Sequence, residues 1–237
     1  MPRLAARFTV FAPDLPGHAL TEAPRWFEPS LPVIAAALEE LVEALAIAPV
    51  VVVGHSAGAA LIARMALERS IAPDLLVGLG AALVPFAGVA GAVLRPMARL
   101  LATTSKVVPL RFRGRTTVER IVRSTGSSLD AGGVDRYLAL TEQPHHVSAT
   151  LSMMASWDLE PLFAELPSLA TPFLLIAGEH DRAVPVAQQR AVAERLGAGR
   201  LVVVEGAGHL VHEERAEAVA GAICEGVDLL EGPVKQT

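Results

Sequence analysis

The chain has 237 residues, of which 52% are apolar, and its formal net charge is −5 at pH 7. A chain of this length can bury a full core, and no linker rich in Pro, Gly or Ser divides it, so we expect one domain with an insertion. Scattered Lys and Arg residues form no basic stripe, which argues against a nucleic-acid partner. The single Cys224 excludes an internal disulfide and fits a reducing, cytoplasmic location. No metal-ligand spacing occurs, and we expect neither a metal nor a cofactor.

The first 45 residues predict a strand, a turn and a helix. No signal-peptide pattern opens the chain; residues 8–12 favour a strand, and residues 13–18 favour a turn. Between residues 31 and 45, apolar side chains recur at helical spacing, with glutamates on the opposite face. We therefore expect an amphipathic helix that covers a sheet.

Residues 48–60 change abruptly from a β-branched run to Ala-rich, helix-forming sequence, with the pattern G-x-S-x-G between them. Such a turn holds its serine in a strained conformation, and Gly54 and Gly58 are expected where a Cβ would collide with the adjacent strand or helix. Ser56 then stands at the carboxyl end of a strand. The N–H of Ala57, at the start of the helix, could bind an oxyanion there. The alternative is a serine that binds phosphate or caps the helix.

Two later loops carry the other members of a catalytic triad. Residues 173–178 predict a buried strand followed by Asp181, and residues 201–205 predict the next strand, followed by His209. Because carboxyl ends of parallel strands share one sheet edge, we expect Ser56, Asp181 and His209 to meet there, in the chain order of nucleophile-elbow hydrolases. His209 would take the proton of Ser56, and Asp181 would orient the imidazole.

Three neighbouring residues are rivals for these roles. Glu179 is expected to be a loop residue beside Asp181, and His212 to begin a helix that, like the one from Pro185, covers the sheet. His55 precedes the serine, but alternation along the strand points its side chain away, so we expect it to pack.

The middle of the chain predicts a helical cap. Residues 75–80 predict another parallel strand, and no charged residue occurs from Leu75 to Leu94. That length could span a bilayer, but Pro85 and four glycines interrupt it. Residues 83–166 are too many for a simple crossover and contain helical patterns near 118–123, 134–140 and 146–155. An apolar cap entry favours a hydrophobic substrate or peripheral membrane contact; the alternative is a cap helix packed on its neighbours.

Three apolar residues of the cap could line a substrate pocket. Met153, Met154 and Trp157 lie close together in the sequence and suit an acyl chain or a ring, although core packing is an equally good interpretation. His145 and His146 are adjacent and would not both face one metal, so we interpret them as solvated or capping residues.

The elbow and the order of the triad residues resemble the α/β-hydrolase fold. The resemblance implies a mostly parallel, doubly wound sheet, with residues 1–82 and 167–237 as the core and residues 83–166 as an inserted helical cap. In that fold the strand at 8–12 is the fourth, and the third, whose loop supplies a second oxyanion donor, lies between it and the elbow strand. The first strands would then be lacking, with Met1 an internal methionine of a longer protein. We expect residues 8–12 either to leave a gap beside the elbow strand or to pair with it.

Four segments resemble, more closely, the magnesium-chelatase accessory hydrolases of bacteriochlorophyll biosynthesis in phototrophic bacteria. They are residues 12–18 (APDLPGH), 53–60 (VGHSAGAA), 153–162 (MMASWDLEPL) and 208–215 (GHLVHEER). The cap segment around Trp157 is the most specific. The resemblance implies a role near magnesium insertion into protoporphyrin, with chelatase subunits as partners. Ala19 departs from the glycine common at that turn, so a positive φ there would be strained.

Two functions remain as hypotheses. The first is a serine hydrolase that cleaves an ester or related carbonyl bond of a hydrophobic, tetrapyrrole-linked substrate. The second is a non-catalytic accessory protein that binds magnesium chelatase or a tetrapyrrole and leaves the triad unused. A dehalogenase-like enzyme would need a carboxylate in place of Ser56.

Overall fold

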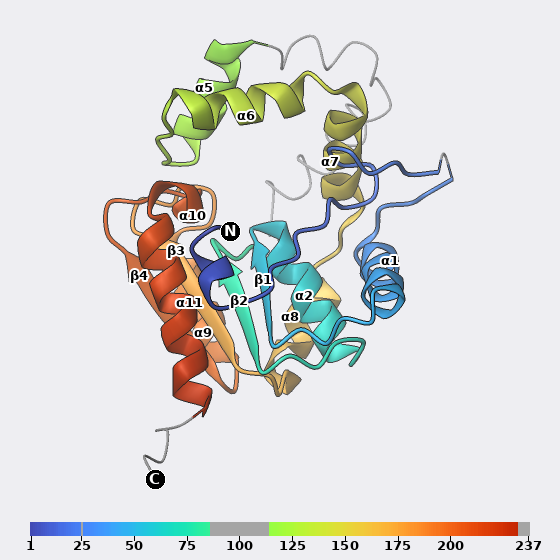
Figure 1. Ribbon diagram of the computed structural model, residues 1–237, viewed down its shortest axis with the longest axis vertical. Helices are drawn as coiled ribbons and strands as arrows, with labels where there is room; N and C mark the ends of the chain where they lie inside the picture. The colour runs from blue at the N-terminus through green and yellow to red at the C-terminus, as the bar shows by residue number, and fades with distance from the viewer. Residues whose placement is uncertain (25, 86–113, 232–237) are drawn as a thin grey trace.

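Four parallel strands form the centre of the fold. The computed structural model describes residues 1–24, 26–85 and 114–231, and the strands lie in the order β1-β2-β3-β4 (Figure 1). They are β1 (Val51–His55), β2 (Leu75–Leu79), β3 (Phe173–Gly178) and β4 (Gly199–Val204). All three pairings are parallel, so the carboxyl ends share one edge, as the sequence predicted.

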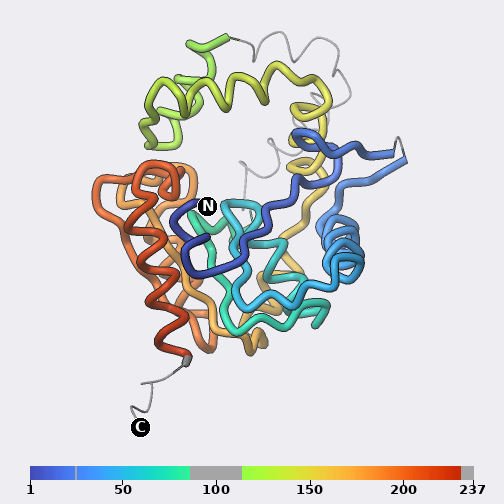
Figure 2. The backbone as a smooth tube through the Cα atoms, viewed as in Figure 1, coloured from blue at the N-terminus to red at the C-terminus, as the bar shows by residue number. Residues whose placement is uncertain are grey.

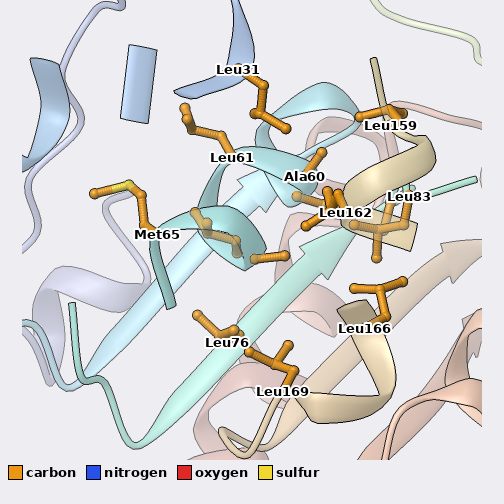
Figure 3. Packing of buried hydrophobic residues seen from close by; sticks show 14 of the residues in the cluster. Leu31, Ala60, Leu61, Met65, Leu76, Leu83, Leu159, Leu162, Leu166 and Leu169 are labelled. Atoms are coloured by element: carbon orange, nitrogen blue, oxygen red, sulfur yellow. The ribbon is translucent and has the colours of Figure 1, made fainter. Parts of the chain in front are cut away.

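Helices cover both faces of this sheet, and the two central strands, β2 and β3, are accordingly apolar and buried along their whole length. Side chains alternate along each strand, so Leu76 and Leu175 face one helical layer while Val77 and Leu174 face the other. The first layer, whose packed side chains appear in Figure 3, contains α1 (Leu31–Ala44), α2 (Ala57–Leu67), α8 (Glu160–Glu165) and α9 (Val186–Arg195). The second contains α10 (Val211–Glu214) and α11 (Ala216–Glu231).

In the described part of the cap, three helices lie beyond the carboxyl ends of the strands (Figures 1 and 2). They are α5 (Arg115–Ser124), α6 (Ala131–Thr141) and α7 (Pro144–Ser156), at the three places where the sequence predicted helices. Helix α8 also falls inside the predicted insertion, yet Leu162 and Leu166 are buried in the core beside α2. The apolar stretch predicted to open the cap lies largely outside the described residues. Within the ranges that the structure describes, no helix is both long and apolar enough to cross a membrane.

The strand predicted at residues 8–12 is not formed, and this prediction was wrong. After a short 3₁₀ helix, η1 (Leu4–Ala6), the chain is irregular: Arg7 contacts Asp228 of α11 at 2.6 Å, and Phe8 packs against the second core layer. A strand forms only where its N–H and C=O groups find a ladder partner, and among the described residues this segment pairs with no strand. Among the described strands, β1 therefore pairs on one side only, with β2, so residues 8–12 do not pair with the elbow strand.

The turn that contains Ala19 has the positive φ anticipated from the sequence, with a value of 46°. Two histidines of α7 hold it: the Ala19 N–H donates to His146 Nδ1 at 3.2 Å, and His145 Nε2 lies 2.8 Å from the Ala19 carbonyl oxygen. Burial, followed by the nearby His18 and His145, lowers the pKa of His146, which keeps its Nδ1 free to accept. The two histidines thus have a structural role that the sequence did not indicate.

We expect Ala19→Gly to raise the free energy of unfolding by about 0.5 to 1 kcal/mol, because glycine adopts this φ without the Cβ clash. Ala36→Gly, on the exposed face of α1, is the matched control and should lower it by a similar amount, since glycine weakens a helix interior. Denaturant unfolding of both variants measures the difference. Equal destabilisation by the two substitutions would contradict the strain at Ala19.

Candidate active site

The turn between β1 and α2 has the strained geometry expected of a nucleophile elbow. Ser56 has φ 53° and ψ −115°, its N–H donates to the Leu79 carbonyl at 2.9 Å, and its own carbonyl accepts from the Ala82 N–H at 3.1 Å. A Cβ at Gly54 would lie 2.3 Å from the Gly58 carbonyl oxygen, so only glycine fits there. At Gly58 the prediction was wrong: among the described residues nothing lies within 4 Å of a Cβ placed there.

Asp181 and His209 form a buried pair beyond the ends of β3 and β4. His209 Nδ1 lies 2.9 Å from Asp181 Oδ2, and the carboxylate is fully buried. The other oxygen, Oδ1, accepts from the N–H groups of Ala183 (2.9 Å) and Val184 (2.8 Å). The carboxylate can only accept, so Nδ1 of His209 carries the proton and donates it, which leaves Nε2 unprotonated in the neutral ring. This is the tautomer that a general base needs.

The pair lies next to the elbow. Nε2 of His55, the residue before Ser56, is 3.1 Å from the His209 carbonyl oxygen, and the two imidazole centroids are 4.7 Å apart. Gly80, after β2, touches the pair, since a Cβ there would lie 2.9 Å from His209 Nδ1. Among the described residues no hydrogen bond joins the Ser56 hydroxyl to His209. The structure therefore brings Asp181 and His209 into direct contact and places both beside the elbow, with Ala57 opening α2 there.

Burial lowers the pKa of the two histidines that lie around the pair, His55 and His212. It is the main cause that lowers the pKa of His55 to about 3, with the nearby His212 and His209 adding to it, so His55 is neutral at ordinary pH. Burial likewise lowers the pKa of His212, whose ring centroid lies 4.5 Å from that of His55. The ring of His55 packs on those of His209 and His212, contacts that the sequence did not indicate.

The carboxylate rival takes another role. Glu179, about half exposed, accepts from the N–H of Gly206 in the loop after β4 at 3.0 Å, and its carboxylate lies 3.8 Å from Nε2 of the adjacent His180. It makes no hydrogen bond to His209 in the part of the chain that the structure describes.

Sequence reasoning missed a buried glutamine that supports the acid loop. Gln189, on α9, is fully buried; its Oε1 accepts from the Ala81 N–H at 3.1 Å and its Nε2 donates to the Val184 carbonyl at 3.0 Å. It thereby joins the loop after β2 to the loop of Asp181. Gln189 lies on the apolar face of a sheet-covering helix, one turn before Val192, and this position could have indicated from the sequence that its side chain is buried.

The three residues predicted to line a pocket occupy different environments. Met153 and Trp157 belong to the core, where Trp157 Nε1 donates to the Pro29 carbonyl at 2.9 Å, and Met154 is 54% exposed. A cavity of about 710 Å³ lies between α7 and the amino-terminal residues 16–29, but none of Met153, Met154 and Trp157 lines it. Its walls are residues 16, 17, 19–23, 27, 29, 143, 145, 148, 149 and 152. Among the residues that the structure describes, no group of acidic, His or Cys side chains is placed to hold a metal ion.

Comparison with known proteins agrees with the fold. Residues 1–222 match the alpha/beta hydrolase family. The chain belongs to that family. Over 235 residues it is 40% identical to the magnesium-chelatase 30 kDa subunit of Rhodobacter capsulatus, an alignment that covers 98% of this chain and 81% of that one. The resemblance inferred from the sequence motifs is thereby confirmed.

Solved structures of this alpha/beta hydrolase family share the fold. An alpha/beta hydrolase fold protein from Burkholderia ambifaria is 26% identical, with a TM-score of 0.78, and the match covers 94% of this chain and 83% of that one. A thermophilic esterase from Thermogutta terrifontis is 22% identical, also with a TM-score of 0.78, over 97% of this chain and 83% of that one. At this identity the esterase supports the fold alone.

Proposed function

We propose that the chain is a serine hydrolase with Ser56 as nucleophile, His209 as general base and Asp181 as the residue that orients the base. The observation that carries this proposal is the strained serine at the end of β1 beside a buried, hydrogen-bonded Asp181–His209 pair. Strain at a non-glycine residue persists where the surrounding structure holds it, and it concentrates at functional sites. A phosphate-binding serine would have no need of a buried acid and imidazole beside it.

The reaction follows from the protonation states. His209 Nε2 removes the Ser56 hydroxyl proton as the oxygen attacks the substrate carbonyl, and the Ala57 N–H donates to the developing oxyanion. His209 then returns the proton to the leaving alcohol, which departs and leaves an acyl-serine. Water repeats the sequence and releases the acid. Asp181 stays ionised and stabilises the imidazolium that forms in each half.

The proposed substrate is an ester or related carbonyl compound with a hydrophobic body, in the cytoplasm. The relative from R. capsulatus is named as a magnesium-chelatase subunit, and on that basis we place the reaction near magnesium chelation in bacteriochlorophyll biosynthesis. The same name favours a second candidate: an accessory protein that binds magnesium chelatase or a tetrapyrrole and does not use Ser56 chemically. Peripheral contact with a membrane surface is compatible with either.

Fluorophosphonate labelling distinguishes the two candidates. We expect one equivalent of the probe to attach to the peptide that contains Ser56, and no attachment to Ser56→Ala, because only an activated serine hydroxyl displaces fluoride from phosphorus. Intact-protein mass spectrometry measures the adduct, and circular dichroism confirms that both samples are folded. A folded wild-type chain that remains unlabelled would favour the accessory protein over the hydrolase.

A further inference from the structure

The backbone around His209 is bound by side chains from three separate elements. His55, at the end of β1, lies with Nε2 3.1 Å from the His209 carbonyl oxygen. On one side of His209, the Gly208 N–H donates to Glu214 Oε2 of α10 at 2.9 Å. On the other, the Leu210 N–H donates to Ser127 Oγ of the α5–α6 turn at 2.8 Å. We infer that His55, Ser127 and Glu214 are positioning residues that place His209 over Ser56, an inference that rests on the proposed function.

The sheet order explains why the base needs this support. Strands β1 and β4 are the two ends of the order β1-β2-β3-β4, so two strands separate the strand of Ser56 from the strand that leads to His209. Neighbouring strands lie about 4.8 Å apart, so the loop after β4 must reach across roughly 14 Å. A loop that extends so far from its strand is mobile unless its backbone groups are bound. The bond from His55 joins the two ends of the sheet directly above the elbow.

The α5–α6 turn of the cap touches the loops of both Asp181 and His209. The Thr125 carbonyl accepts from the Arg182 N–H at 3.1 Å, next to Asp181. Gly126, with φ 85°, lies so close that a Cβ there would be 1.9 Å from the His180 carbonyl oxygen, and a Cβ at Gly208 would be 2.3 Å from the Gly126 carbonyl carbon. This cap turn therefore packs directly against the loops that contain Asp181 and His209 and restricts the movement of both.

Glu214 connects the same turn to the loop of the base. While Oε2 accepts from the Gly208 N–H, Oε1 accepts from the Ser128 N–H at 2.9 Å. One carboxylate thus binds a backbone donor on each side, and charge-assisted bonds of this kind are stronger than neutral ones. Ser127, only 3% exposed, has its hydroxyl oxygen fixed beneath Leu210. The cap acts here through the backbone of Gly208 and Leu210, the residues on either side of His209.

His55 must present a specific tautomer for this arrangement. A carbonyl oxygen can only accept, so Nε2 of His55 carries the proton and donates it. Because burial keeps the ring neutral, Nδ1 is then unprotonated. Among the residues that the structure describes, the titratable groups that face this ring are His209 and His212, both in ring contact with it.

The first test compares two exchanges of His55 with p-nitrophenyl butyrate as substrate. His55→Leu removes the donor and is expected to lower kcat by about ten- to a hundredfold with KM nearly unchanged, because a small displacement of the base slows the chemical step. His55→Gln carries an N–H at the position of Nε2 and should restore most of the lost rate. His145→Leu is the matched control, since its Nε2 also meets a backbone carbonyl, but in the Ala19 turn; its kcat should match the wild type. Equal losses in His55→Leu and His55→Gln, at equal melting temperature, would overturn the inference.

Ser127→Ala tests the contribution of the cap. It leaves the Leu210 N–H without its acceptor, so we expect a fall in kcat of about tenfold at unchanged KM, together with faster amide exchange at Leu210. Unchanged exchange and unchanged kcat would show that Ser127 does not position the base.

Nuclear magnetic resonance of ¹⁵N-histidine-labelled protein gives a readout that needs no activity and no folded variant. We expect His55 to be neutral with its proton on Nε2 in the wild-type chain near neutral pH; a proton on Nδ1 would remove the proposed bond and the inference with it. If the wild type is neither labelled by the fluorophosphonate nor active, the proposed function fails. Even then, the tautomer of His55 and the amide exchange rate at Leu210 show whether His55 and Ser127 hold the loop of His209.

Discussion

Replacing Asp181 with Asn is expected to lower kcat by about 10⁴-fold while the fold and KM stay nearly the same. The reason lies in how the carboxylate is held. Its Oδ1 accepts from two backbone N–H groups, those of Ala183 and Val184, so the oxygen of an Asn side chain must take that place. The amide NH₂ then faces His209 Nδ1, which must accept. The imidazole proton moves to Nε2, and the base can no longer receive the proton of Ser56.

Steady-state kinetics with p-nitrophenyl butyrate and the rate of fluorophosphonate labelling measure this effect. Glu179→Gln is the matched control, because it makes the same exchange of carboxylate for amide two residues earlier, on a half-exposed side chain that binds the Gly206 N–H. Its kcat should stay close to the wild-type value. Wild-type activity in Asp181→Asn, or an equal loss in both variants, would mean that Asp181 does not set the tautomer of the base.

The parts of the site that could be predicted are those fixed by local sequence. Each of the strands before Ser56, Asp181 and His209 is a short apolar run with an abrupt end, and parallel strands place their following loops at one edge. The cap helices were likewise visible as periodic segments between the two halves of the sheet. For these elements the neighbouring residues carry the information that the fold uses.

The features that sequence missed depend on partners far along the chain. Residues 8–12 have strand-forming side chains, but whether they form a strand depends on a ladder partner, and among the described strands none pairs with them. Alternation along the strand predicted that His55 packs, yet it could not show that a loop 154 residues later folds onto its ring. Ser127 and Gln189 are polar residues in unremarkable local patterns, and only the folded chain shows the buried donors that they satisfy.

The two glycines of the elbow should respond in opposite ways to the same added methyl group. A Cβ at Gly54 would lie 2.3 Å from the carbonyl oxygen of Gly58 and 2.6 Å from the nitrogen of Ala59, both backbone atoms in the first turn of α2. Neither can rotate aside, so α2 would have to move away from β1. Ala59 and Ala60 are fully buried against the core, and such a shift would open their packing (Figure 3 labels Ala60).

We therefore expect Gly54→Ala either to prevent folding or to lower the free energy of unfolding by more than about 4 kcal/mol, the range of the most disruptive single substitutions. Gly58→Ala places its methyl group where the described residues leave open space, inside the first turn of a helix, and should raise the free energy of unfolding by up to about 1 kcal/mol. Urea unfolding of the purified chains, with yield of folded protein recorded for each, measures both. If Gly58→Ala destabilised the chain as strongly as Gly54→Ala, the open space around Gly58 would not govern its response, and the expected contrast between the two glycines would be wrong.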